Sequence, residues 1–243
     1  MNALQHGFAP ASLAASDEEL LALLREDVPY GDLTTQRAGI EAMPARMIFR
    51  ARQEMVVCAT EEAARLSELC GAEVVRWLPS GLHAEKGGVL LEVTGTAGML
   101  HRVWKSAQVL VEWASGISTA TAQMVRLATP LPVVCTRKSV PGTRRMSSKA
   151  VRAGGGGLHR LGLSESLLLF AEHRGFMAAM PTGIVDGYHS MEPEKKLVVE
   201  VSNLAEALLW ARAGADVVQL EKFTPAQVEE CCRCLRGLGT RIA

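Results

Sequence analysis

The 243-residue sequence lacks several features that would place it in other classes of protein. No apolar run approaches the ~18–20 residues that a membrane-spanning helix needs, so we expect no transmembrane segment. The N-terminal segment lacks a basic region followed by an apolar core, which argues against a secretory signal. The six cysteines are few and irregularly spaced, as is typical of reduced thiols. Together these absences predict a cytoplasmic protein.

The sequence also lacks net charge, with 26 basic and 26 acidic residues. Nucleic-acid-binding proteins usually carry a basic excess over a face or a domain, so the balance argues against that class. Hydrophobic residues make up 48% of the chain, which is enough for a substantial core. The length suits one large domain or two modest ones.

Aspartate and glutamate are absent from Trp113 to Ser164, although the chain is acidic elsewhere. The same stretch keeps eight cations: Arg126, Arg137, Lys138, Arg144, Arg145, Lys149, Arg152 and Arg160. Cations without acids create a positive field that collects anions. Aromatic residues for base stacking are missing here apart from Trp113, so small, multiply charged anions are favoured over RNA.

The hydrophobic pattern divides the chain into two parts. Residues 1–112 mix short strands with helices and predict an α/β sandwich. Within it we expect a first helix capped by Ser16, a strand over Met47–Cys58 and a helix capped by Thr60. From Ala97 a helical stripe follows, and a second helix is predicted over 118–127. Later, two apolar strands flank a helix, a βαβ pattern that predicts an α/β barrel or an open sheet over 113–243.

Charged residues follow three of the predicted strands. Arg137 and Lys138 come after the strand at 132–136, Glu200 ends LVVEV, and Glu221 and Lys222 follow DVVQL. Ligands of α/β folds bind at the carboxyl ends of the strands, so we expect these side chains to converge on one pocket. The alternative is that they are solvated loop charges.

The residue types suggest what this pocket binds. Arginine and lysine pair with phosphates and carboxylates, and His159 beside Arg160 could orient a carboxylate. Glycines 154–157 either let a ligand approach the backbone or form a flexible turn. Glu200 and Glu221 could hold Mg²⁺ or bond to sugar hydroxyls. A cationic cage facing two carboxylates suits a sugar that carries pyrophosphate.

These residues lie in motifs that resemble the quinolinate phosphoribosyltransferase (nicotinate-nucleotide pyrophosphorylase) family, and most closely its ModD-type paralogue, linked to molybdenum-transport operons. The shared motifs are YGDLTT, SGIST (Ser115–Thr119), TRKSVPGTR (Thr136–Arg144), KAVRAGGGGLHRLGLSE (Lys149–Glu165), VEV (Val199–Val201) and AGADVVQLEKF (Ala213–Phe223). The resemblance implies an N-terminal α/β sandwich followed by an incomplete α/β barrel of the type II phosphoribosyltransferase kind. A neighbouring subunit would complete the barrel in a homodimer with a shared active site.

The resemblance also implies a reaction. A phosphoribosyl group passes from phosphoribosyl pyrophosphate (PRPP) to a carboxylated, pyridine-like acceptor, and pyrophosphate leaves in the presence of Mg²⁺. The positions that match the family's motifs give catalytic roles to Lys138, Glu200 and Glu221, the two carboxylates being the candidate Mg²⁺ ligands. Substrate-binding roles fall to Lys105, Arg137, His159, Arg160, Phe170 and Lys222.

Several positions depart from the family pattern. Lys105 stands where the family has an arginine that reaches into the partner's site, and Phe170 stands where it has a lysine. Glu221 replaces an aspartate, Lys222 an asparagine and Cys135 an aspartate. Losing one cation at position 170 favours an acceptor with fewer charges or with an aromatic face. The family continues for about forty further residues, so we expect the C-terminal barrel to be truncated.

Two other function classes fit the same residues. A non-catalytic accessory protein of molybdate uptake could hold an oxyanion in the same cationic cage. A barrel aldolase could use Lys138 or Lys222 to form a Schiff base with a carbonyl substrate.

Overall fold

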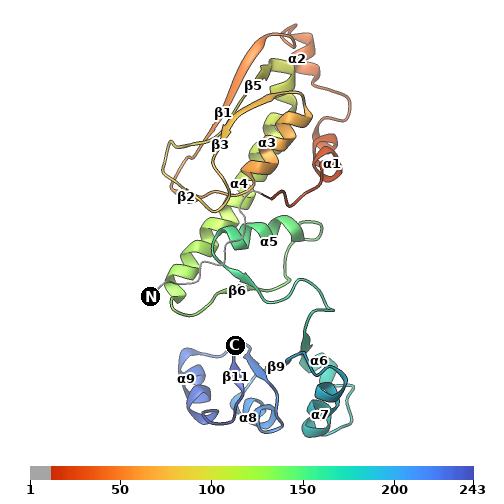
Figure 1. The fold of residues 1–243 in the computed structure, drawn as a ribbon, viewed down its shortest axis with the longest axis vertical. Helices are drawn as coiled ribbons and strands as arrows, with labels where there is room; N and C mark the ends of the chain where they lie inside the picture. Colours follow the sequence, from red (N-terminus) through yellow and green to blue (C-terminus); the bar gives the residue numbers. More distant parts are fainter. Residues whose placement is uncertain (1–11) are drawn as a thin grey trace. The chain divides into compact units, whose positions relative to one another are not determined.

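A computed structural model of the chain describes residues 12–243, which pack into two compact units (Figure 1). The first unit ends at His159, and the second comprises Arg160–Ala243. The domain division that we expected at residues 112 and 113 falls inside one long helix and stays a prediction.

The first unit is built on a three-stranded antiparallel sheet in the order β1-β5-β3. Its strands are β1 (Pro44–Arg50), β3 (Glu73–Trp77) and β5 (Val89–Thr96). Helices α3 (Thr60–Leu69) and α4 (Ala97–Ala128) pack against this sheet and against each other (Figure 1). Leu66 of α3, Leu91 of β5 and Val103 of α4 are almost completely buried between these layers. The smaller elements are α1 (Asp17–Asp27), α2 (Leu33–Arg37), β2 (Met55–Val56) and β4 (His83–Ala84).

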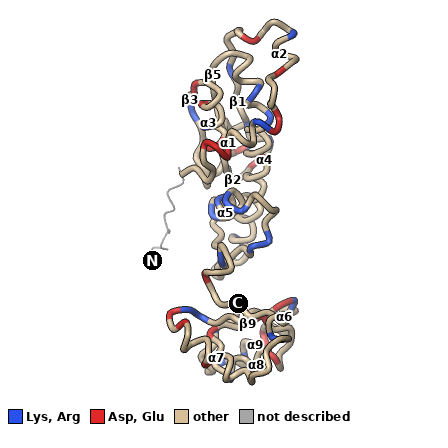
Figure 2. Tube along the Cα trace, turned by 90° about the vertical axis from the view of Figure 1, so that its right-hand side faces the viewer, with Lys and Arg blue, Asp and Glu red and all other residues tan. Residues whose placement is uncertain are grey.

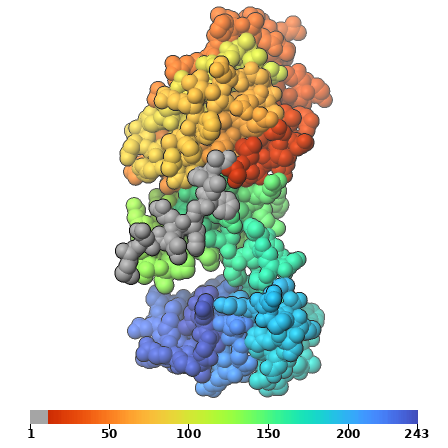
Figure 3. Space-filling model, in the orientation of Figure 1, coloured from red at the N-terminus to blue at the C-terminus, as the bar shows by residue number. Residues whose placement is uncertain are grey.

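The N-terminal helix α1 begins as the sequence predicts. The Ser16 hydroxyl accepts a hydrogen bond from the Glu19 backbone, and the Glu19 carboxylate accepts one from the Ser16 backbone. Arg65 of α3 donates two hydrogen bonds to Asp17, so the two helices lie side by side on the surface (Figure 3). Further along, Asp32 caps α2 by accepting a hydrogen bond from the Thr35 backbone.

Helix α4 corrects one of our expectations. The predicted break before Ser118 is wrong, because the helix runs without interruption from Ala97 to Ala128. Ser115 and Ser118 do not end it; their hydroxyls bond to the backbone of Cys58 and Val56 and tie the helix to the segment around β2. A serine inside a helix is tolerated when its hydroxyl finds such a partner.

Two boundaries near β2 also differ from expectation. The predicted single strand over Met47–Cys58 is interrupted after Arg50 and continues only as β2. The predicted cap, Thr60, is instead the first residue of α3, and its hydroxyl donates to the Leu78 carbonyl. The cap position belongs to Ala59, which has a left-handed backbone with φ of 68°.

The last two strands of the first unit are short and pair in parallel. They are β6 (Val134–Cys135) and β7 (Gly157–Leu158), connected through α5 (Arg144–Ala153). The pairing continues past the strands, because the His159 amide donates to the Cys135 carbonyl at 3.0 Å. The residues that follow β6 and β7 therefore leave at the same edge.

The second unit is a four-stranded parallel sheet in the order β11-β10-β9-β8. Its elements are β8 (Leu167–Leu169), α6 (Ala171–Arg174), α7 (Pro181–Met191), β9 (Leu197–Val201), α8 (Leu204–Arg212), β10 (Val217–Leu220), α9 (Pro225–Cys234) and β11 (Arg241–Ile242). The βαβ unit predicted from the apolar strands is confirmed. Leu197, Val198 and Val199 are buried in succession along β9, as in a sheet covered on both faces.

The architecture is thus an N-terminal α/β sandwich followed by an incomplete α/β barrel, as the sequence predicted. Within residues 12–243, no helix has both the length and the apolar character that crossing a lipid bilayer requires.

Candidate functional site

Residues 113–164, the acid-free stretch, contain cations that form ion pairs in the structure and cations that form none with the described part of the chain. In the first unit, Lys149 and Arg145 of α5 form ion pairs with carboxylates outside the stretch. By contrast, the side chains of Arg137 and Lys138 form no ion pair with any described residue. Basic residues gather along α5 (Figure 2), but only part of this charge is available to a ligand. Lys149 therefore belongs to the core of the first unit, and Arg145 to an exposed ion pair on its surface.

The ion pairs of Lys149 form a buried cluster. Its ammonium lies 3.0 Å from Glu61 and 2.8 Å from both carboxylate oxygens of Glu62. The Ser80 amide and hydroxyl donate to Glu61 at 2.7 and 2.5 Å, and the Ala14 amide donates to Glu62 at 2.7 Å. Burial lowers the pKa of Lys149, but the charges and hydrogen bonds of Glu62 and Glu61 outweigh it, so the pKa is raised above 10.5. Lys149 is therefore charged at neutral pH.

The glycine run at 154–157 packs against helix α4. A Cβ atom on Gly154 would lie 2.4 Å from the Ser118 carbonyl oxygen, and one on Gly156 would lie 2.7 Å from the Thr121 methyl group. Only glycine allows α5 and its C-terminal turn to approach α4 so closely. These two glycines thus serve helix packing, whereas a ligand contact at the glycine run stays a prediction.

This packing predicts a clear stability effect. Gly154→Ala should lower the free energy of unfolding by about 1–3 kcal/mol, because the added methyl group meets backbone atoms that cannot move aside. Gly116→Ala is the matched control: this exposed helical glycine has open space around it, so alanine should raise stability by about 0.5–1 kcal/mol. Urea unfolding followed by circular dichroism measures both. Equal effects of the two substitutions would contradict the packing role.

Three candidate residues lie at the carboxyl edge of the β6–β7 pair. Arg137 and Lys138 follow β6, and His159 follows β7 with its amide bonded to Cys135. Lys138 is exposed, whereas Arg137 and His159 are half-buried. The first unit thus brings two cations and an imidazole to one strand edge, as the sequence predicted for Arg137 and Lys138.

The two candidate carboxylates lie at the carboxyl edge of β9 and β10. Glu200 pairs with Gln219 across the strands, and its carboxylate accepts a hydrogen bond from the Gln219 amide at 3.1 Å. Glu221 follows β10 directly, and its amide donates to the Val201 carbonyl at the end of β9 at 3.0 Å. The Lys222 ammonium is 3.0 Å from the Glu221 carboxylate, and both side chains are exposed. The second unit therefore brings Glu200, Glu221 and Lys222 to one strand edge.

Sequence reasoning missed Arg174, which supports this edge. Its guanidinium donates to the Glu200 carbonyl at 2.6 Å and to the Glu206 carboxylate at 3.3 Å, and it lies 5.8 Å from the ring centre of Trp210. Arg174 thereby fixes the backbone from which the Glu200 side chain projects. The available signal was its position in the AEHRG segment, where a cation ends a short helix.

Arg160 and Phe170 are brought together in the second unit. The Arg160 guanidinium carbon lies 5.8 Å from the Phe170 ring centre, within the range of a cation–π contact. The Phe170 ring stacks on the His173 ring at 5.5 Å, with 24° between the planes. His173 Nδ1 also accepts a hydrogen bond from the Phe170 backbone at 3.0 Å. Arg160 is only 9% exposed, so its charge is held within the protein.

Lys105 lies on the exposed side of α4. Its ammonium is 4.4 Å from the Trp104 ring centre and 3.4 Å from the Gln108 side-chain oxygen. It also lines a cavity of about 490 Å³ between α1 and α4, together with Trp113 and Leu23. Its neighbours thus belong to its own helix and to α1, and its predicted reach into the site of a second subunit stays a prediction.

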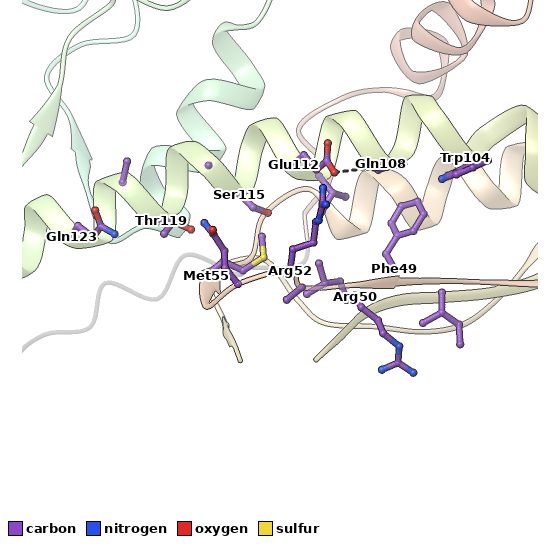
Figure 4. Close-up of a pocket in the computed structure, with 17 residues that line it drawn as sticks. Phe49, Arg50, Arg52, Met55, Trp104, Gln108, Glu112, Ser115, Thr119 and Gln123 are labelled. Atoms are coloured by element: carbon purple, nitrogen blue, oxygen red, sulfur yellow. Dashed lines mark hydrogen bonds between the residues drawn. The ribbon is translucent and has the colours of Figure 1, made fainter. Parts of the chain in front are cut away.

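A larger cavity of about 770 Å³, which sequence reasoning did not find, lies between α4 and the segment around β1 and β2 (Figure 4). Phe49, Met55 and Trp104 supply apolar walls, and Arg52 points toward Glu112 of α4. None of the predicted site residues lines it. The convergence of the predicted residues of both units on one pocket likewise stays a prediction.

Comparison with known proteins adds two family matches that together cover most of the chain. The family model described as "Quinolinate phosphoribosyl transferase, N-terminal domain" matches residues 32–115. The model described as "Quinolinate phosphoribosyl transferase, C-terminal domain" matches residues 117–243. The second match alone spans more than half of the chain.

Individual relatives agree with these matches. The chain is 48% identical over 228 residues to a Rhodobacter capsulatus protein named "Putative pyrophosphorylase ModD", covering 92% of this chain and 87% of that protein. It is 29% identical to the Methanocaldococcus jannaschii "Probable nicotinate-nucleotide pyrophosphorylase [carboxylating]", covering 87% and 75%. The crystal structure of NadC from Streptococcus pyogenes matches with a TM-score of 0.83 at 27% identity, covering 93% of this chain and 81% of that one.

Proposed function

The chain belongs to the quinolinate phosphoribosyl transferase family, and we propose that it transfers the phosphoribosyl group of PRPP to a carboxylated, pyridine-like acceptor. Pyrophosphate is the leaving group. The observation that carries the proposal is the sorting of the cations in the acid-free stretch. Lys149 and Arg145 are neutralised by carboxylates, whereas Arg137 and Lys138, at a strand edge, are left without an acidic partner among the described residues.

The residues present suit this reaction. As the acceptor nitrogen bonds to the anomeric carbon, the bond to pyrophosphate breaks and the leaving group takes the electron pair. Arg137 and Lys138 stabilise the negative charge that gathers on it, because fixed cations need no rearrangement as that charge develops. Little proton transfer is needed, so positioning supplies much of the acceleration.

Glu200 and Glu221 are the proposed Mg²⁺ ligands. Among residues 12–243 no group of three or more histidine, cysteine, aspartate or glutamate side chains could hold a metal ion. This fits magnesium, which usually takes one or two protein carboxylates and completes its shell with water and substrate phosphates. When bound, Mg²⁺ would neutralise charge on the pyrophosphate. Glu200 and Glu221 themselves supply hard oxygen ligands, and Gln219 orients Glu200.

This assignment predicts a changed magnesium requirement. Glu221→Gln should raise the Mg²⁺ concentration for half-maximal pyrophosphate release by about tenfold, since an amide oxygen is a weaker ligand than a carboxylate. Glu194→Gln, at an exposed position outside the site, is the control and should leave the requirement unchanged. A magnesium titration of the initial rate measures both. An unaltered titration curve for Glu221→Gln would remove Glu221 from the metal site.

We further propose that the chain acts as a homodimer with a shared active site. Lys105 is exposed on α4, where its ammonium contacts the Gln108 side chain and the Trp104 ring. The proposed role follows from the family resemblance, in which the corresponding cation serves the partner's site.

Two measurements test the proposed function. Calorimetric titration should show PRPP binding that strengthens with Mg²⁺, and a coupled assay should show pyrophosphate release when a pyridine carboxylate is added. Molybdate is the ligand that distinguishes the two function classes, because a non-catalytic accessory protein would bind molybdate and release no pyrophosphate. Binding of molybdate without binding of PRPP would refute the proposed transferase and support the accessory protein.

A further inference from the structure

The turn that follows β9 is held in place by side chains of the second unit. Ser202 donates two hydrogen bonds to the Glu206 carboxylate, one from its amide at 3.1 Å and one from its hydroxyl at 3.3 Å. The Glu206 amide in turn donates to the side chain of Asn203, which caps helix α8, at 2.9 Å. Glu200 lies two residues before Ser202, so the backbone that leads from Glu200 into α8 has a defined path.

Arg174 connects helix α6 to this turn. Its Nη1 donates to the Glu200 carbonyl oxygen at 2.6 Å, and its Nη2 donates to the Glu206 carboxylate at 3.3 Å. Its guanidinium carbon lies 5.8 Å from the ring centre of Trp210, a residue that is 4% exposed. The Arg174 side chain is 17% exposed, so water competes little for these bonds. One side chain thus joins α6, the end of β9 and α8.

Glu200 is therefore bonded through both its backbone and its side chain. Its carbonyl accepts from Arg174 of α6, and its carboxylate accepts from Gln219 of β10 at 3.1 Å. A carboxylate that binds a metal is usually oriented by partners of this kind, and losing one partner typically lowers metal affinity by ~10–100-fold. Arg174 and Gln219 have this relation to the carboxylate of Glu200.

The charge of Arg174 makes its role testable. A guanidinium close to a proposed Mg²⁺ site would by itself repel the metal ion, although its pairing with Glu206 offsets part of that charge. Charge alone therefore predicts that a metal binds more tightly once Arg174 is removed. Loss of the backbone bond to Glu200 predicts the opposite, because a less well oriented carboxylate is a poorer ligand. The sign of the change distinguishes the two effects.

We propose that Arg174 is a positioning residue, which acts through the Glu200 carbonyl and holds the Glu200 carboxylate where it binds Mg²⁺. Glu206 serves the same end, because it fixes the guanidinium and offsets its charge. The inference rests on the proposed function, in which Glu200 is a Mg²⁺ ligand. It adds two residues to which the shared sequence motifs give no role.

Binding of Mn²⁺, which carboxylate sites accept in place of Mg²⁺, tests the inference without turnover. The 243-residue chain is titrated with Mn²⁺ alone, and the electron paramagnetic resonance signal reports the free metal. Arg174→Gln should raise the Kd for Mn²⁺ by about tenfold or more. Arg212→Gln removes an exposed cation at the end of α8 and should leave the Kd unchanged. Arg174→Lys keeps the charge but lacks the guanidinium fork, so it should also weaken binding, even if Arg174→Gln does not fold.

The magnesium dependence of pyrophosphate release supplies a second readout. In Arg174→Gln the Mg²⁺ concentration for half-maximal release should rise by about tenfold, whereas kcat at saturating Mg²⁺ should stay within about twofold of the wild type. A variant that only folds less completely would be slower at every Mg²⁺ concentration and would keep the wild-type midpoint. That pattern would overturn the positioning role.

The outcomes separate this inference from the proposed function. If Arg174→Gln binds Mn²⁺ as tightly as the wild type or more tightly, the inference is overturned and the transferase stays intact. If the wild type binds Mn²⁺ but releases no pyrophosphate with any pyridine carboxylate, the transferase fails, and weaker binding by Arg174→Gln still supports the positioning role. A wild type that binds no Mn²⁺ would overturn the inference, whether or not pyrophosphate is released.

Discussion

Replacing Lys149 with methionine should lower the free energy of unfolding by about 3–5 kcal/mol, a large share of the stability of a single domain. Its ammonium lies within 3.0 Å of both Glu61 and Glu62, whose side chains are 4% and 0% exposed. Methionine fills the space without supplying a positive charge. Two carboxylates would then remain buried against each other with hydrogen bonds but no cation, and burying such charges is strongly unfavourable.

The matched control is Arg145→Met on the same helix. Arg145 pairs with Glu19, but its side chain is 65% exposed and that of Glu19 is 50% exposed, so water screens the pair. Its loss should cost about 0–1 kcal/mol. Urea unfolding at neutral pH measures both variants. If Lys149→Met unfolds at the same urea concentration as Arg145→Met, the buried cluster does not hold the first unit together.

The pH dependence of this effect follows from the raised pKa of Lys149. Burial lowers that pKa, yet Glu62 and Glu61 outweigh it, so the folded value lies above the ordinary value of 10.5. A group whose pKa is raised on folding contributes fully below its unfolded pKa and loses that contribution as the pH rises through the folded one. The difference between wild type and Lys149→Met should therefore stay constant near neutrality and shrink in strongly alkaline solution.

Periodicity predicted the elements of the second unit well because their signals are local. LVVEV and DVVQL are continuous apolar runs on either side of a helical pattern, and they pair in parallel as β9 and β10. In this register Glu200 lies directly opposite Gln219, and the Gln219 amide donates a hydrogen bond to the Glu200 carboxylate. The carboxyl-edge rule was therefore sufficient to predict the strand edge at which the charged residues of this sheet lie.

The first unit shows why other expectations were wrong. The Ser115–Ser118 segment resembles a helix end in sequence, but partners on Val56 and Cys58 keep it helical. Lys149 looks like one more free cation until the fold brings Glu61 and Glu62 beside it. In both cases the deciding partner lies more than fifty residues away, and a local pattern contains no information about it.

Replacing Lys138 with alanine should lower kcat for pyrophosphate release by about 10²–10³-fold, the usual cost of removing one group that stabilises charge in the transition state. Lys138 is exposed and forms no ion pair with any described residue, so the free energy of unfolding should change by less than about 0.5 kcal/mol. Lys86→Ala removes an exposed lysine from a turn in the same unit and should leave turnover unchanged. Turnover of Lys138→Ala at the wild-type rate would show that the strand-edge cation does not serve the reaction.

The same variant tests the shared active site. Lys138→Ala and Lys105→Ala should each be inactive alone, because one lacks the cation of its own strand edge and the other lacks the cation proposed to serve the partner. In a homodimer with shared sites, co-expression of the two variants should restore about a quarter of the wild-type activity, since half of the dimers are mixed and each mixed dimer has one intact site. Sites formed within a single chain cannot recover in this way. Activity that stays at the level of the separate variants would therefore confine Lys105 and Lys138 to the same subunit or remove Lys105 from the site.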